Sequence, residues 1–179
     1  LSSKPVESSQ QQIINAFDQA ECSIWKEFKI FERAAVLDQI ATELERASER
    51  IYQTLTHEAG KTISDAAGEL REAVDFCRYY AIQTRTLNPG SKARGTVVAI
   101  SPWNFPLAIF VGQIVAALGA GNTVLAKPAE QTPRIARLAL SLMHRAGLPE
   151  SALHLLFGRG ETVGNAVSAM GRADMSKRL

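Results

Sequence analysis

Apolar residues in the first half of the chain recur at helical spacing. The clearest stripe follows the i, i+3, i+4, i+7 pattern of one helix face and consists of Leu37, Ile40, Ala41 and Leu44. Shorter stripes of the same kind predict further helices over residues 7–21, 51–55 and 70–81. Gly60 would end the helix that begins near residue 51, because glycine is common just past a helix C-terminus. The turn at residues 88–91 then ends the helical region.

From Arg94 onward, short apolar strands alternate with helices. Strands are expected at residues 96–100, 122–126 and 153–157, and helices at 107–118, at 132–146 and from about 161. Thr132 is a suitable N-cap for the helix at 132–146, with Pro133 at its first position and Gly147 at its end. Strands joined by helices in this order imply right-handed crossovers and a parallel sheet, so the predicted fold class is α/β.

Composition and charge exclude several classes of protein. The chain has 179 residues, of which 46% are hydrophobic, so it is long and apolar enough to bury a core. Its net charge of +2 lies in the tail at residues 172–179, and the rest of the chain balances at 17 basic and 17 acidic residues. A neutral body gives no electrostatic reason to expect a nucleic acid or an anionic membrane as partner.

Other features of the sequence indicate whether the chain spans a membrane and in which compartment it lies. Residues 95–126 carry no charge, but prolines and glycines interrupt this stretch. We therefore expect a buried strand, helix and strand there, and not a membrane span. Cys22 and Cys77 form neither a metal pattern nor a disulfide framework, which favours a reducing, cytoplasmic setting. The scattered histidines have no metal-ligand spacing, so no metal is expected and each is interpreted as a surface or capping residue.

Two motifs stand where the first two expected strands end. The first places an amide side chain between prolines and reads Ser101-Pro102-Trp103-Asn104-Phe105-Pro106. The second places a cation three residues before a carboxylate and reads Lys127-Pro128-Ala129-Glu130. With residues 107–114 and 131–133, these motifs resemble the aldehyde dehydrogenase superfamily. Within it, they look like the 1-pyrroline-5-carboxylate (glutamate semialdehyde) dehydrogenase half of bifunctional proline utilization A.

The resemblance runs from about residue 8 to residue 164 and implies a domain organisation. Residues 1–90 would form the helical segment of the cofactor domain, packed on an incomplete Rossmann-like parallel sheet. Residues 91–171 would form a partial dinucleotide-binding segment, and residues 172–179 a divergent tail. Three parallel strands would leave an open sheet edge, so self-association of the isolated chain is expected.

By the same resemblance, Asn104 is the catalytic donor that stabilises the alkoxide formed when a thiolate attacks an aldehyde. Losing one such donor typically costs about 2.7–4 kcal/mol. The alternative for Asn104 is a turn asparagine that bonds its own backbone. Pro102 and Trp103 would line the cofactor near its nicotinamide end, and the alternative for Trp103 is ordinary core packing.

The remaining site residues are implied as ligands of NAD. Lys127 and Glu130 would lie at the adenosine ribose, Ala129 would be a further cofactor contact, and a carboxylate that accepts the 2′-hydroxyl favours NAD over NADP. The alternative for Lys127 and Glu130 is a solvated charge pair at a helix entry. Residues 158–164 have G-x-G-x-x-x-G spacing, one residue longer than the usual fingerprint, and Gly160 and Gly164 would let the dinucleotide approach the backbone.

The resemblance also predicts what is missing. In the family, the nucleophilic cysteine and the general-base glutamate lie downstream of the glycine turn. Cys77 falls on an apolar helix stripe and is expected to be an inert core thiol. We therefore expect a piece of an NAD-dependent dehydrogenase that oxidises glutamate semialdehyde to glutamate in proline catabolism, inactive by itself. A non-catalytic dinucleotide-binding or structural module, or a piece of another aldehyde dehydrogenase, are the alternatives.

Overall fold

A computed structural model describes residues 6–169, and helices come first in it, as the sequence predicts. The helical part comprises α1 (Gln10–Glu21), η1 (Ile24–Glu27), α2 (Ile30–Arg46), α3 (Ser48–Ala59) and α4 (Ile63–Arg85). The alternating part comprises β1 (Thr96–Ile100), α5 (Ala108–Gly119), β2 (Thr123–Lys127), α6 (Pro133–Arg145), η2 (Glu150–Ala152), β3 (Leu153–Leu155) and η3 (Gly160–Gly164). The boundaries at residues 90 and 171 stay predictions, and the tail at 172–179 lies outside the described residues.

The strands form one parallel sheet in the order β1-β2-β3, which confirms the predicted fold class. In the register, Ile100 of β1 lies beside Lys127 of β2, so both strands end at the same edge of the sheet. All five residues of β2 are buried, whereas β1 is mostly half-buried. Among the described residues, β1 pairs with β2 alone, so its other edge is open.

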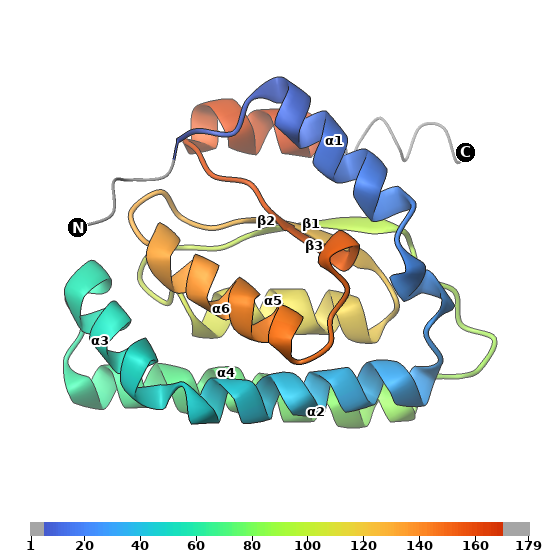
Figure 1. The fold of residues 1–179 in the computed structure, drawn as a ribbon, viewed down its shortest axis with the longest axis horizontal. Helices are drawn as coiled ribbons and strands as arrows, with labels where there is room; N and C mark the ends of the chain where they lie inside the picture. Colours follow the sequence, from blue (N-terminus) through green and yellow to red (C-terminus); the bar gives the residue numbers. More distant parts are fainter. Residues whose placement is uncertain (1–5, 170–179) are drawn as a thin grey trace.

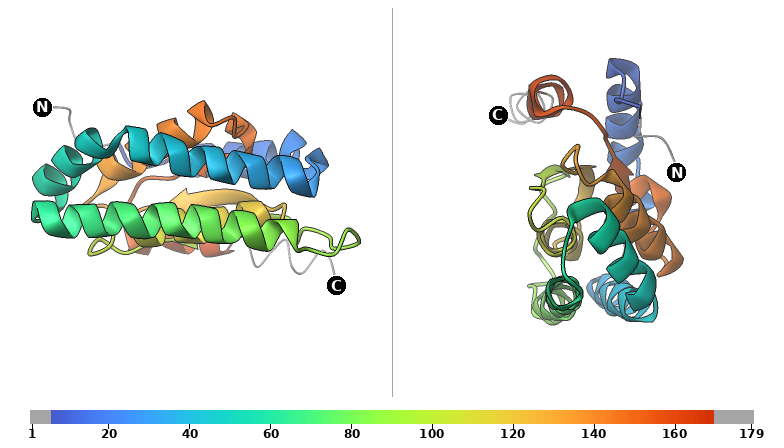
Figure 2. Two further views of the ribbon diagram at one scale, coloured as in Figure 1. Left: turned by 90° about the horizontal axis from the view of Figure 1, so that it is seen from below. Right: turned by 90° about the vertical axis from the view of Figure 1, so that its left-hand side faces the viewer.

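Helices cover the sheet unequally on its two faces (Figures 1 and 2). α1 and the helix after Gly160 lie on one face, above the sheet in Figure 1. α5 and α6 lie on the other face, and α2 and α4 form a further layer beneath them. None of the helices in residues 6–169 combines the length and the apolar character that a bilayer crossing requires.

The alternation of side chains along β2 divides the core between these faces. Val124 and Ala126 belong to the large core formed with α2 to α6, whereas Leu125 belongs to a small core beneath α1. Trp25 of η1 is fully buried, and its indole N–H donates to the carbonyl of Leu118 at 3.1 Å. The helical segment is thereby attached to the end of α5.

Several local expectations were wrong in detail. The first helix begins at Gln10, not near residue 7, because Ser9 caps it and forms a reciprocal capping box with Gln12. The third strand ends at Leu155. Thr132 stands at the N-cap position of α6, but its side chain makes no capping hydrogen bond. The carboxylate of Glu58 takes that role, and it accepts from the backbone N–H groups of Arg134 and Ile135 at 2.8 and 2.9 Å.

Candidate cofactor site and active site

The candidate residues gather at the C-terminal edge of the sheet, where ligands of open parallel sheets bind. The backbone N–H of Ser101, just past β1, donates to the carbonyl of Lys127 at 3.2 Å. This bond places the start of the Ser101–Pro106 motif beside the end of β2. The two sequence motifs, 20 or more residues apart in the chain, therefore lie side by side at the C-terminal ends of β1 and β2.

The loop at residues 101–107 presents its middle to solvent and buries its ends. Asn104 is exposed, and its side chain makes no hydrogen bond to any residue in the described part of the chain. Asn104 is thus not the self-bonded turn asparagine of the alternative. Trp103 is 60% exposed, so core packing is also wrong as an interpretation of this residue. Pro102 is half-buried beside it.

A buried carboxylate holds the end of this loop. Glu69 of α4 is 2% exposed, and its Oε2 accepts from the backbone N–H groups of Leu107 and Ala108 at 2.9 and 3.2 Å. Its Oε1 lies 2.5 Å from the Lys61 ammonium, which also lies 4.6 Å from the centre of the Phe105 ring. These contacts fix the segment next to Asn104.

Lys127 is the most unusual residue at this edge. It is 4% exposed, and its ammonium makes one hydrogen bond, at 3.4 Å to the carbonyl of Pro128. No carboxylate lies within ion-pair distance of it among the residues that the structure describes, although its charge acts on the Glu7 carboxylate at longer range. A solvated pair with Glu130 is therefore wrong. A buried ammonium with so little compensation is costly unless an acceptor arrives.

The neighbours of Lys127 in its motif differ in exposure. Ala129 is half-buried, and its carbonyl accepts from the backbone N–H of Thr132 at 3.1 Å. Glu130 is exposed, in the turn between Ala129 and Thr132. The carboxylate of Glu130 is thus free to meet a ligand that enters from solvent, whereas Lys127 lies beneath.

The glycine turn accommodates its additional residue as a π-helical turn. Gly160–Gly164 forms bonds to the fifth preceding residue, including Gly164 N–H to the Arg159 carbonyl at 3.2 Å. A Cβ on Gly164 would lie 3.7 Å from the Lys127 side chain, so the turn and β2 are in contact. A Cβ on Gly160 would meet nothing within 4 Å. The turn therefore presents an open backbone to the same edge.

Glu7 is a contact of this turn that the sequence did not indicate. Its carboxylate accepts from the backbone N–H of Arg159 at 3.0 Å and from the hydroxyl of Thr162. These bonds, the Thr162 hydroxyl first, hold the pKa of Glu7 below its usual value. Ser8 adds two more bonds, to the backbone of Phe157, at 2.7 and 3.0 Å. The glycine turn is thus attached to the segment before α1.

The two cysteines lie outside this constellation. Cys77 is fully buried in the core, as predicted, and burial raises the pKa of its thiol to about 12. Cys22 is exposed at the C-terminal end of α1. Residues 6–169 bring together no group of three His, Cys, Asp or Glu side chains that could hold a metal ion. The edge therefore offers an amide, an ammonium and open backbone, but no thiol.

In a comparison with known protein families, the aldehyde dehydrogenase family matches residues 3–175. Among curated proteins, the bifunctional protein PutA of Klebsiella aerogenes is 51% identical over 162 residues. That alignment covers 89% of this chain and 12% of the relative. The 1-pyrroline-5-carboxylate dehydrogenase 1 of Halalkalibacterium halodurans is 37% identical, over 91% of this chain and 34% of the relative.

Solved structures give the same picture. A proline utilization A variant from Bradyrhizobium japonicum superposes with a TM-score of 0.86 at 47% identity, over 92% of this chain and 19% of its own. A 1-pyrroline-5-carboxylate dehydrogenase from Thermus with bound NAD gives 0.85 at 30% identity, over 90% of this chain and 35% of its own. The chain thus spans between about an eighth and a third of these relatives.

Proposed function

Since this chain belongs to the aldehyde dehydrogenase family, we propose that it forms part of the NAD site and the oxyanion site of a dehydrogenase that oxidises glutamate semialdehyde to glutamate. The relatives named for 1-pyrroline-5-carboxylate dehydrogenase support this substrate, and the relative with bound NAD supports the cofactor. The observation that carries the proposal is the buried side chain of Lys127, whose ammonium has no ion pair among the described residues and whose methylene groups lie near Gly164.

The residues at the sheet edge fit a dinucleotide. Lys127 would donate to a ribose hydroxyl, which supplies the acceptor that the ammonium lacks. Glu130 would accept from the 2′-hydroxyl, and Gly160 and Gly164 would let the dinucleotide lie against the backbone. Pro102 and Trp103 would flank the nicotinamide end. When bound, NAD supplies the acceptor for the hydride that leaves the aldehyde carbon.

Asn104 would act on the substrate and not on the cofactor. Its amide N–H would donate to the aldehyde oxygen as negative charge develops there, from a loop held in place by Glu69. Because neither cysteine lies in this loop, we expect the 179-residue chain to bind NAD without oxidising aldehyde.

Titration of NAD into the purified chain tests the cofactor site. Lys127→Met should weaken NAD binding at least tenfold, because the buried donor is lost while the length of the side chain is kept. Lys29→Met is the matched control, because Lys29 is exposed before α2 and should leave the dissociation constant unchanged. Equal NAD affinity in the wild type and in Lys127→Met would contradict the proposed cofactor site.

Asn104 is tested in the longer dehydrogenase that contains this segment. Asn104→Ala should lower kcat by about 10²–10³-fold, the usual cost of one oxyanion donor, and leave NAD affinity unchanged. A loss of NAD affinity together with an unchanged kcat would contradict the role given to this side chain.

A further inference from the structure

A hollow lies at the other end of the sheet, where β1 begins. Its volume is about 340 Å³, and Lys26, Arg33, Ser91, Lys92, Ala93 and Gly95 line it. Gly95 directly precedes β1, whereas the candidate cofactor residues follow the C-terminal ends of β1 and β2. The hollow is therefore separate from the proposed NAD site, at the other end of the strands.

Arg33 of α2 is the central residue of this hollow. It is 9% exposed, and its guanidinium makes no hydrogen bond or ion pair with any residue in the range 6–169. Its Nε is fully buried without an acceptor. Burial lowers the pKa of this group, yet an arginine stays protonated in proteins. A buried cation without a partner is among the costliest arrangements in a protein.

The guanidinium of Arg33 packs closely against a glycine. Gly121 has φ +88°, in the left-handed region, and a Cβ at this position would lie 1.9 Å from Nη1 of Arg33. Any other residue would therefore collide with the guanidinium as well as strain the backbone. The fold thus brings Arg33 close to the backbone beside the hollow instead of directing it into solvent.

The other charged side chains of the hollow are also cationic. Lys26 is partly neutralised, because its ammonium donates to the Glu21 carbonyl at 2.7 Å and lies 3.6 Å from the Glu21 carboxylate. Lys92 is exposed and has no ion pair within the described part of the chain. No carboxylate lines the hollow. Two positive charges, on Arg33 and Lys92, are left without compensation.

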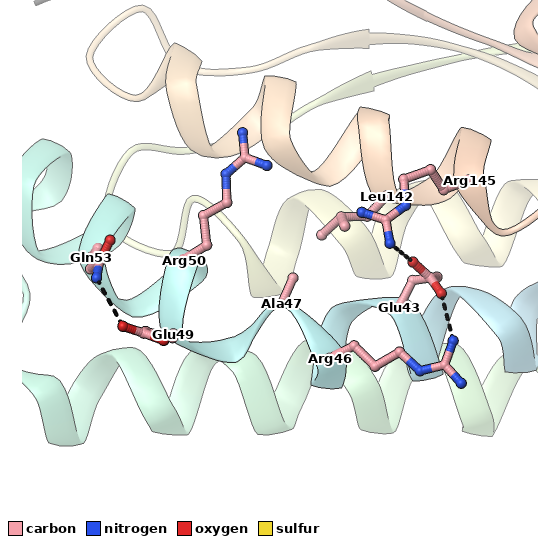
Figure 3. Close-up of a pocket in the computed structure, with 8 residues that line it drawn as sticks. All are labelled: Glu43, Arg46, Ala47, Glu49, Arg50, Gln53, Leu142 and Arg145. Carbon is pink, nitrogen blue, oxygen red and sulfur yellow. Dashed lines mark hydrogen bonds and ion pairs between the residues drawn. The ribbon is translucent and has the colours of Figure 1, made fainter.

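A groove elsewhere in the fold shows how the chain compensates other arginines (Figure 3). There Glu43 lies between two arginines, with its carboxylate oxygens 3.0 Å from Arg46 and 2.7 Å from Arg145. Glu49 lines the same groove, where its carboxylate accepts from Gln53 and not from Arg50. Arg33 has no such carboxylate partner among the described residues, so an anion from outside the chain can compensate its charge.

We propose that the hollow at Arg33 binds a small divalent oxyanion of the phosphate class. The planar guanidinium can donate two parallel N–H bonds to two oxygens of a tetrahedral anion. Lys92, exposed on its flexible stem, can close over the anion, and the Ser91 hydroxyl can donate to it. The two uncompensated charges match the charge of hydrogen phosphate.

Titration of inorganic phosphate into the 179-residue chain tests this site. At constant ionic strength, with chloride as the replaced ion, phosphate should bind saturably and raise the unfolding temperature. Arg33→Gln should weaken phosphate binding at least tenfold, and Lys92→Gln several-fold. Arg50→Gln removes an arginine from the groove of Figure 3 and should bind phosphate as the wild type does.

Two controls make the result decisive. Lys127→Met should leave phosphate binding unchanged, because the cofactor edge is not involved, so failure of the NAD proposal would leave this one standing. If Arg33→Gln does not fold, phosphate binding by Lys92→Gln tests the site instead. Lys92 is exposed, so its loss should not affect folding. A response that is linear in phosphate, or that Arg50→Gln and Lys92→Gln lose equally, would overturn the proposal.

Discussion

At the scale of single residues, the two cysteines differ most in their surroundings. Cys77 is fully buried and the pKa of its thiol is raised to about 12, whereas Cys22 is exposed. Because the thiolate is the reactive species, we expect a disulfide reagent at about pH 8 to label Cys22 in the native chain and Cys77 only after unfolding. Peptide mapping of the labelled chain checks this. Labelling of both thiols at equal rates under native conditions would contradict the placement of Cys77.

His144 and His154 predict a pH dependence of stability. Burial is the first cause that lowers the pKa of each imidazole, and Glu150 partly opposes it at His144. Both are half-buried, and each bonds the backbone, His144 at Leu153 and His154 at Ser151, so neither is a plain surface histidine. Below about pH 6.5, the ordinary pKa of histidine, the unfolded chain binds more protons than the folded chain. The free energy of unfolding should therefore fall as the pH drops below that value.

Urea unfolding at about pH 7 and about pH 5.5 measures this effect. His154→Gln should reduce the loss of stability between the two pH values, because one of the two groups no longer titrates. The depressed pKa of Glu7 acts in the same direction but at lower pH, below about 4.5, so it does not interfere. An identical loss in the wild type and in His154→Gln would assign the pH dependence to other groups.

The sequence could predict that the candidate residues Asn104 and Lys127 lie near the C-terminal ends of two strands. It could not predict the residues that hold them, because those contacts join distant parts of the chain. Glu69 reaches Leu107 across 38 residues, and Glu7 reaches Arg159 across 152. A carboxylate on a helix surface and one that caps a loop look the same in a local pattern. Only the fold separates them.

At the scale of elements, the start of α6 depends on a residue of α3. Because Glu58 accepts from two backbone N–H groups in the first turn of α6, Glu58→Ala should lower the free energy of unfolding by about 0.5–2 kcal/mol. Glu58→Gln should cost less, since an amide oxygen can still accept one bond while the favourable charge at the helix N-terminus is lost. Chemical denaturation measures both variants.

Glu49→Ala is the matched control for this cap. Glu49 lies on the same helix, and its carboxylate accepts one exposed bond from Gln53 at 3.3 Å. Its loss should change stability by less than about 0.5 kcal/mol, as for most surface substitutions. If Glu49→Ala and Glu58→Ala destabilise the chain equally, Glu58 does not cap α6.

The helices and strands themselves were largely predictable, because their apolar periodicity is strong. Thr96–Ile100 agrees with the expected range in full, and α5 agrees within one residue at each end. The short 3₁₀ turns η1 and η2 were not predicted, since three or four residues carry no periodicity. The π-turn at Gly160 was visible only as one residue too many in the glycine spacing.

At the scale of the whole molecule, the open edge of β1 predicts self-association. β1 is half-buried, pairs on one side among the described residues, and ends in Ile100, which is 47% exposed. Unpaired N–H and C=O groups on such an edge recruit another strand. We expect multi-angle light scattering to show a mass that rises with concentration, and Ile100→Lys to reduce that rise. A constant monomer mass in the wild type would contradict this expectation.

The bonds between Ser8 and Phe157 also bear on synthesis of the protein. These residues are 149 positions apart, and the apolar face of α1 packs on Leu125 and Leu156. Translation at about 5–20 residues per second delivers α1 long before its partners leave the ribosome. For several seconds the nascent chain therefore carries Ile13 with nothing to cover it, and this first helix is the segment we expect a chaperone to hold.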